Sequence, residues 1–151
     1  MSLNAGSEAV SMAHANQLLA VHCPGAELPS DEYERIQLLT LSGYQDLLYK
    51  TVHGYFKDAW FTLSYGQNLK DFPLCADFAK ILVGLVCLAA AMVGLGVRPY
   101  FFRLHYTKLN GSRHAINGVL CLDGSVKFLE PQTMEWMDIP KDLKKFDRVR
   151  L

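Results

Sequence analysis

The stretch that decides the fold is Asp71-Phe72-Pro73-Leu74-Cys75-Ala76-Asp77-Phe78-Ala79, which leads into a run without charged residues from Ile81 to Val97. Asp71 can act as an N-cap and Pro73 suits a first helical turn, so we expect a helix that begins just before Cys75. A thiol in that turn faces the positive end of the helix dipole, which favours the thiolate. Cys75 is therefore a candidate nucleophile. The alternative is a small buried hydrophobic residue, because free cysteines are among the most buried residues.

The apolar run after Lys80 has two interpretations. About twenty apolar residues span a bilayer, so the run is a candidate transmembrane helix. It is short for that purpose, it contains Gly84, Gly94 and Gly96, and it shows no pair of aromatic belts. We interpret residues 72–96 as the buried central helix of a globular domain, ended by its last two glycines.

Length and composition favour one globular domain over residues 1–151. Fifteen basic residues balance fifteen acidic ones, so the charge favours neither nucleic acid nor an anionic membrane as a partner. Half of the residues are hydrophobic, which excludes a disordered chain. The cysteines are widely spaced, which argues against a zinc site or a disulfide scaffold and suits a reducing compartment. They are Cys23, Cys75, Cys87 and Cys121.

The N-terminus bears on localisation. It lacks the positive n-region and the long apolar h-region of a signal peptide, so we expect a cytoplasmic protein. Met1-Ser2-Leu3 is similar to an expression leader, so a removed signal stays an open alternative.

Residues 1–55 are predicted to form a helical N-terminal part. A short helix around Leu18–Val21 should stop at Pro24-Gly25. Ser30 should cap a second helix, with an apolar stripe of Tyr33, Ile36 and Leu39. A helical spacing resumes after Gly43, whereas the aromatic residues between positions 55 and 65 predict a strand.

Residues 98–133 are predicted to form antiparallel strands. Apolar and polar residues alternate over 100–107, and Asn110-Gly111 is a strong hairpin signal. Two more strands should follow around the tight turn at Asp123-Gly124, namely His114–Cys121 and Val126–Glu130, and Pro131 should end the meander. Residues 138–151 read as a charged tail with at most one short helix. Helices followed by antiparallel strands predict an α+β fold.

His114 is the best candidate for a base beside Cys75, because it begins a strand directly after a tight turn. Asp123 lies at the next turn, about 30 Å away along an extended strand, and cannot reach His114. If the loop at that turn holds three residues, Glu130 lies on the face of His114, one diagonal step away. If it holds two, Glu130 lies on the opposite face, against Asn117. Glu130 is then an exposed strand end.

A reacting carbonyl oxygen also needs hydrogen-bond donors. The backbone N–H of Cys75 at a helix start can serve, and Gln67 or Asn68 in the preceding loop can add a side-chain amide. The alternative for these two residues is ordinary loop polarity.

Three motifs together resemble a papain-like, transglutaminase-like cysteine peptidase module. They are Cys75–Ala79 opening a helix, His114–Asn117 opening a strand, and Asp123-Gly124 followed by Phe128–Thr133. The likeness covers roughly residues 60–135 and is to the C-terminal protease domain of a mushroom agglutinin and its bacterial and phage-type relatives. It implies a papain-like fold, with Cys75 as nucleophile, His114 as general base and acid, and Glu130 as the orienting carboxylate.

The resemblance implies a thiol hydrolase, a peptidase or amidase, that acts on a peptide or amide substrate. Relatives often carry an acidic residue beside the cysteine, where this chain has Leu74 and Ala76. The agglutinin domain depends on calcium, but Asp71 and Asp77 form no larger acidic cluster here, so we expect no metal and no cofactor. The alternative is a catalytically inactive papain-fold binding or structural module, possible in a phage-like particle, with a virion- or phage-associated location.

Overall fold

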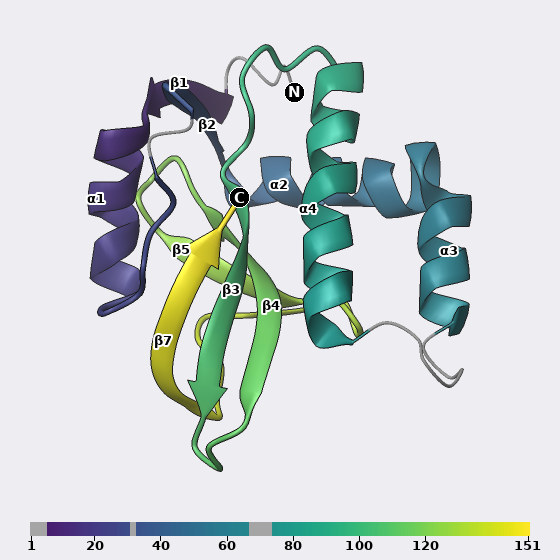
Figure 1. Cartoon of the computed structure of the whole chain (residues 1–151). Helices are drawn as coiled ribbons and strands as arrows, with labels where there is room; N and C mark the ends of the chain where they lie inside the picture. The colour runs from purple at the N-terminus through teal and green to yellow at the C-terminus, as the bar shows by residue number, and fades with distance from the viewer. Residues whose placement is uncertain (1–5, 31–32, 67–73) are drawn as a thin grey trace.

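The computed structural model describes residues 6–30, 33–66 and 74–151 and shows an α+β fold. The N-terminal half contains mostly helices and the C-terminal half contains strands (Figure 1). The elements are β1 (Ser7–Ser11), α1 (Met12–His22), β2 (Arg35–Leu39), α2 (Leu41–Lys50), the π-helix η2 (Thr51–Tyr55), α3 (Lys57–Gly66), α4 (Cys75–Met92), β3 (Phe101–Lys108), β4 (Arg113–Leu120), β5 (Val126–Glu130), β6 (Glu135–Met137) and β7 (Leu143–Arg150).

The main sheet has five strands in the order β6-β5-β4-β3-β7, and all neighbouring strands are antiparallel. The predicted meander is its centre. Gly111 and Gly124 have φ values of 87° and 85°, a backbone conformation that their two hairpin turns require. Leu120 pairs with Val126, and the Cys121 N–H donates to the Ser125 carbonyl at 2.8 Å. The loop therefore holds three residues, and the register that places Glu130 on the face of His114 is confirmed.

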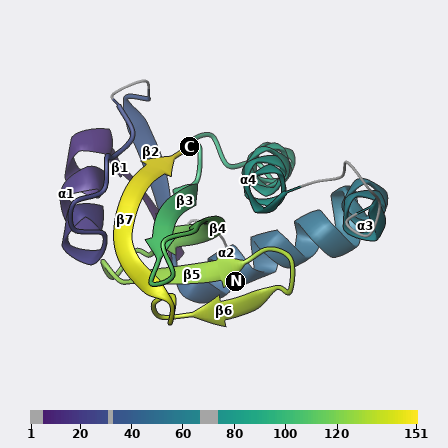
Figure 2. The ribbon, with the colours of Figure 1, turned by 60° about the horizontal axis from the view of Figure 1, so that its bottom comes forward.

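The sheet separates two hydrophobic cores. Figure 2 shows α1 on one side of the sheet and α4 on the other. On the α1 side, Met12 and Leu19 pack against strand residues such as Tyr100 and Phe102. On the α4 side, α2 and α4 pack against the alternate strand residues, including Phe101 and Val119. Alternation along β3 and β4 therefore fills both cores and decides which side chains stay available at the sheet ends.

β3 and β4 approach closely where Gly118 pairs with Phe102. A Cβ atom at Gly118 would lie 2.4 Å from the Phe102 ring. The ring occupies the space that any other residue at 118 would need, so glycine is required at this position.

The predicted central helix is confirmed as α4, which begins at Cys75 with Leu74 as its N-cap residue. The Leu74 N–H donates to the Asp77 carboxylate at 2.9 Å, and Gly94 follows the helix with a φ of 91°. Asp71 and Pro73 lie outside the described residues. By length and composition α4 could cross a membrane, but one side of it packs on the sheet, as in a core helix.

The prediction that this helix is buried all round is wrong. Only 39% of its residues are buried, and an apolar side faces outward. This side carries Ile81, Leu88 and Met92, which are 41%, 56% and 57% exposed.

The N-terminal prediction is correct for α1 and α2 and wrong between them. Residues 35–39 form β2 instead of a helix, because they pair with β1 and the Gln37 carbonyl accepts from the Tyr100 N–H at 2.9 Å. These tertiary bonds override a local spacing that suits a helix. Gly43 lies within the first turn of α2 and does not interrupt it.

Two further segments differ from prediction. The aromatic segment at 57–66 is helix α3, in which Phe61 and Tyr65 stack one turn apart and Trp60 packs edge-on against Phe78. Aromatic content alone had suggested a strand there. The tail is strand β7, and its pairing with β3 contains register shifts that break simple alternation.

Candidate functional site

His114 and Glu130 form a direct pair at one end of the sheet. His114 Nε2 lies 2.7 Å from Glu130 Oε1, and the two side chains are 15% and 18% exposed. Ile116 is the expected strand partner of Glu130 in this register, so His114 lies one diagonal step away on the same face. The predicted pairing of these two residues is what the structure shows.

The pair defines the proton arrangement on the imidazole. An ionised carboxylate only accepts hydrogen bonds, so the Nε2–H of His114 donates to Glu130. The second carboxylate oxygen accepts the Gln132 N–H at 3.2 Å, which holds the carboxylate in place. Nδ1 of His114 is then the nitrogen that can accept a proton from a neighbour or a ligand.

Cys75 lies at the same end of the sheet. Helix α4 and strand β4 lie side by side and run in the same direction (Figure 1). Asn117 joins them, because its Nδ2 donates to the Ala79 carbonyl at 2.9 Å. Cys75 precedes Ala79 by one helical turn, about 6 Å, and His114 precedes Asn117 by about 10 Å of strand.

Tyr106 lies beside His114 at this end of the sheet. Its ring packs edge-on against His114 at 5.7 Å, and its hydroxyl donates to Asp142 at 2.9 Å. Burial raises the pKa of Tyr106, the hydrogen bond to Asp142 raises it further, and the charges of Glu130 and Cys75 act in the same direction. Among the described residues, no hydrogen bond joins the Cys75 thiol to His114.

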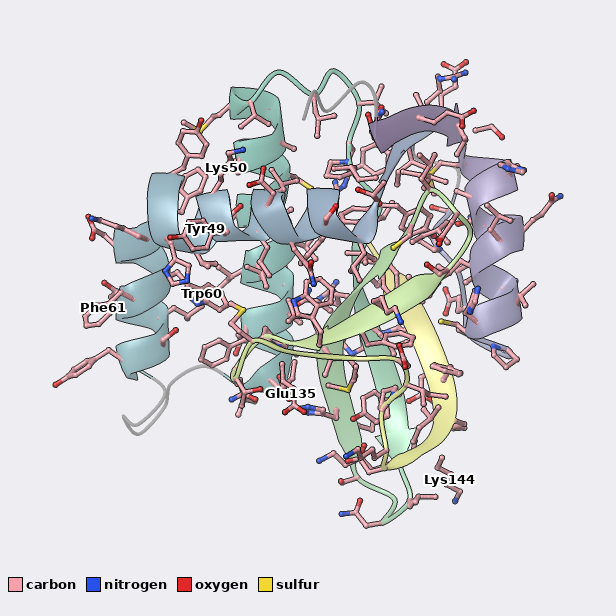
Figure 3. All side chains as sticks on the ribbon, turned by 180° about the vertical axis from the view of Figure 1, so that it is seen from behind. Tyr49, Lys50, Trp60, Phe61, Glu135 and Lys144 are labelled. Atoms are coloured by element: carbon pink, nitrogen blue, oxygen red, sulfur yellow. The ribbon has the colours of Figure 1, made fainter. Side chains whose placement is uncertain are left out.

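A groove with a volume of about 470 Å³ opens beside the His114–Glu130 pair, which is within the range of small-ligand sites. Apolar side chains form part of its lining, and charged side chains of both signs surround them. The lining consists of Tyr106, Lys108, His114, Ile116, Glu130, Glu135, Met137, Pro140, Lys141 and Asp142. Glu135 pairs with Glu130 across β5 and β6 and is labelled in Figure 3.

Other predicted site residues have different outcomes. Gln67 and Asn68 lie outside the described residues, so their role as oxyanion donors stays a prediction. Asp123 is a turn residue, as predicted: its carboxylate accepts from the Ser125 N–H and hydroxyl at 2.9 and 2.6 Å. Within the ranges the structure describes, no three His, Cys, Asp or Glu side chains gather at one point.

Sequence reasoning missed the groove wall that precedes β7. Lys141 and Asp142 line the groove, although they belong to residues 138–151, which the sequence predicts to be a charged tail. The signal was present in the apolar residues Leu143, Phe146 and Val149, but their spacing of three suggests a helix rather than a strand.

Comparison with known proteins shows the fold. No protein-family model matches the chain, and no curated protein matches it. The structure is similar to that of the lectin PSL1a in a complex with E64, with a TM-score of 0.68 and 19% identity, over 93% of this chain and 50% of that one. It is also similar to Polyporus squamosus lectin bound to the human-type influenza-binding epitope Neu5Aca2-6Galb1-4GlcNAc, with a TM-score of 0.63 and 15% identity, over 93% and 49% of the chains.

These findings correct the function inferred from the resemblance. The matched structures are lectin chains, and one holds a carbohydrate epitope, so the assignment to a cysteine peptidase family, the thiol hydrolase activity and the peptide or amide substrate are contradicted. The three motifs report local structure, namely a helix opened by a cysteine and a hairpin with a defined register. Local structure specifies a fold more closely than it specifies an activity. The chain shares its fold with about half the length of these lectin chains.

Proposed function

We propose that this chain is a binding module, and that its binding site is the groove lined by His114 and Glu130, with Cys75 at the same end of the sheet. The observation that carries the proposal is the His114–Glu130 pair at 2.7 Å on the wall of a 470 Å³ groove. A concave site with an apolar part and a few convergent polar groups is the usual form of a ligand site. The similarity to lectin chains supports binding as the function.

The proposed site presents three kinds of groups to a ligand. His114 offers Nδ1 as an acceptor while Glu130 holds its other nitrogen. The N-terminus of α4 offers backbone N–H groups and the positive end of the helix dipole. Tyr106, Ile116 and Met137 offer apolar surface. A polar ligand with one apolar face suits this combination.

We also propose a chemical role for each site residue, and these roles do not depend on catalytic turnover. Cys75 is the nucleophile of the site, His114 takes its proton, and Glu130 orients the imidazole and stabilises its charged form. The position of Cys75 at the first residue of α4, at the His114 end of the sheet, supports this assignment.

We also propose a more specific description of the fold. The arrangement is papain-like, with a central helix that begins at Cys75 and precedes the antiparallel sheet of His114 and Glu130. Residues 1–151 form one domain. One sheet that takes part in both hydrophobic cores supports this reading.

The two compounds in the matched structures test the proposal directly. Titration calorimetry and intact-mass measurement with E64, and calorimetry with the trisaccharide Neu5Aca2-6Galb1-4GlcNAc, should show binding of at least one compound to the wild-type chain. His114→Ala should weaken that binding about tenfold or more, since it removes a hydrogen-bonding group from the site.

Cys87→Ser is the matched control for Cys75→Ser, because both cysteines lie on α4. E64 binding that requires Cys75 but not Cys87 would assign the reactive thiol, and saccharide binding that requires His114 would assign a carbohydrate ligand. The proposal is contradicted if neither compound binds, or if either binds equally well to the wild-type chain and to His114→Ala.

A further inference from the structure

Basic side chains lie directly opposite one another on the outer face of β3 and β7, away from the groove. In the register of these strands, Arg103 pairs with Arg150 and His105 pairs with Arg148. Figure 1 shows the two strands side by side. Like charges at directly opposite positions of an antiparallel pair destabilise the sheet, so this arrangement needs a compensating group.

Arg103, His105 and Arg148 lie on the same face of β3 and β7, opposite the face that packs in the core on the α1 side. Leu104 and Val149, which alternate with them, are fully buried in the core on the α1 side. His105 pairs with Arg148 and Tyr106 with Phe146, so Asp147 is the additional residue of a β-bulge. The bulge lets both Phe146 and Val149 face the core, while Arg148 stays on the outer face.

Few carboxylates compensate the basic side chains. Arg150 forms an ion pair with Glu27 at 3.1 Å. Asp147 accepts from the Thr107 hydroxyl at 2.8 Å and lies 3.6 Å from the Lys145 ammonium group. Within residues 6–30, 33–66 and 74–151, Arg103 and Arg148 form no ion pair.

The surroundings of His105 affect its hydrogen bonding and its pKa. Its Nε2 is buried and has no hydrogen-bond partner among the described residues. Burial together with the charges of Arg148, Arg103 and Arg150 lowers the pKa of His105 to about 4, although the charge of Asp147 opposes this shift. Burial also lowers the pKa of Arg103, with Arg148 and Arg150 adding to the effect. The outer face therefore holds a concentrated positive potential.

We propose that the outer face formed by Arg103, His105 and Arg148 binds an oxyanion, that is, a phosphate, sulfate or carboxylate group of a ligand. The planar guanidinium groups of two arginines match the geometry of such anions and form strong charge-assisted hydrogen bonds with them. A bound anion removes the repulsion between the opposed cations. It also allows His105 to take up a proton, so binding and protonation favour each other.

This site is independent of the proposed binding groove. His105 and Tyr106 are adjacent in sequence, so their side chains point to opposite faces of β3. Tyr106 lines the groove and His105 does not. Loss of one site therefore leaves the other available for measurement.

The test follows the His105 imidazole by NMR during pH titration in sodium sulfate, sodium phosphate, N-acetylneuraminic acid and sodium chloride at equal ionic strength. Sulfate stays doubly charged across the titration of His105, so it reports the histidine alone. We expect the His105 midpoint to rise by about one pH unit or more in at least one oxyanion relative to chloride. The sulfate, phosphate and carboxylate arms identify the preferred group.

Matched variants separate a site from general attraction to a basic surface. Arg103→Gln and Arg148→Gln should each weaken the oxyanion effect about tenfold or more. Lys144→Gln, at the start of β7 and labelled in Figure 3, removes the same charge away from the proposed contacts and should change it little. His105→Gln should abolish the proton uptake that accompanies binding, measured by calorimetry in buffers of different ionisation enthalpy.

Two results would overturn the proposal. One is a His105 midpoint that is the same in chloride and in every oxyanion. The other is an oxyanion effect that Lys144→Gln reduces as much as Arg103→Gln does. Circular dichroism of each variant establishes that the fold is retained.

Discussion

His105 and His114 lie on neighbouring strands of one sheet, and their surroundings differ in sign. His114 is paired with a carboxylate, Glu130, on the face that lines the groove. His105 faces Arg148 across β3 and β7, and a nitrogen of its ring is buried without a partner. The same residue type thus lies beside an opposite charge in one place and beside like charges in the other.

The difference shows how a strand assigns roles by position. Adjacent strand residues point to opposite faces, so a step of one residue exchanges one set of neighbours for another. On β4 and β5, this arrangement brings His114 next to the opposite charge of Glu130. On β3 and β7, it brings His105 next to the like charge of Arg148. Substitutions can alter the sheet that carries both histidines, or the surroundings of each histidine separately.

The largest effect is expected from Gly118→Ala, which alters the sheet beneath both sites. A Cβ atom at Gly118 would lie 2.4 Å from the buried Phe102 ring. Overpacking of this kind destabilises by about 1–3 kcal/mol, and we expect a loss in that range from urea unfolding. Gly84→Ala is the control, because a Cβ at this helical position meets nothing within 4 Å and should stabilise α4 by roughly 0.5–1 kcal/mol. Equal stability of the two variants would contradict the packing described here.

Glu130→Gln should disturb the His114 side alone. The amide keeps the size of the carboxylate but removes the charge that stabilises a protonated His114. We expect alkylation of Cys75 by iodoacetamide to slow about tenfold at neutral pH, with little change in melting temperature. Glu34→Gln is the matched control, since Glu34 is exposed and does not line the groove. If both variants slow the reaction equally, the pairing of Glu130 with His114 has no special role.

His105→Gln should disturb the other face in a pH-dependent way. The folded pKa of His105 is lowered to about 4, below its ordinary value. The stability that comes with neutral His105 is therefore complete above about pH 6.5 and is lost progressively as the pH falls toward 4. Urea unfolding at pH 7 and pH 4.5 should show a smaller loss in His105→Gln than in the wild-type chain. His14→Gln, at an exposed position on α1, should lose stability as the wild-type chain does.

The parts of the fold that follow from local chemistry could be predicted from the sequence. Asn110-Gly111 and Asp123-Gly124 determine two hairpins, and counting from the second turn left two registers for Glu130, of which the structure shows the one on the face of His114. The segments that depend on distant partners could not. Strand β2 exists because β1 and residues 98–100, just before β3, pair with it, and no pattern within residues 35–39 contains that information.

Some residues of the candidate site could likewise be predicted from the sequence, and others could not. His114 and Glu130 lie on one hairpin, so their distance follows from strand geometry once the length of the turn is known. The groove wall at Lys141 and Asp142 depends on β7, whose bulge at Asp147 hides the alternation of a strand. The function assigned by resemblance was wrong because short motifs identify a shared fold, and the matched lectin chains carry that fold.

The most direct test of the central claim, that Cys75, His114 and Glu130 form one site, is the rate of iodoacetamide labelling of each cysteine, measured by peptide mass spectrometry at neutral pH. We expect Cys75 to react fastest of the four cysteines and His114→Ala to slow its reaction about tenfold or more. His53→Ala, at an exposed position, should leave the rate unchanged. Labelling of Cys75 at the rate of Cys87, or a rate that His114→Ala does not alter, would contradict the claim.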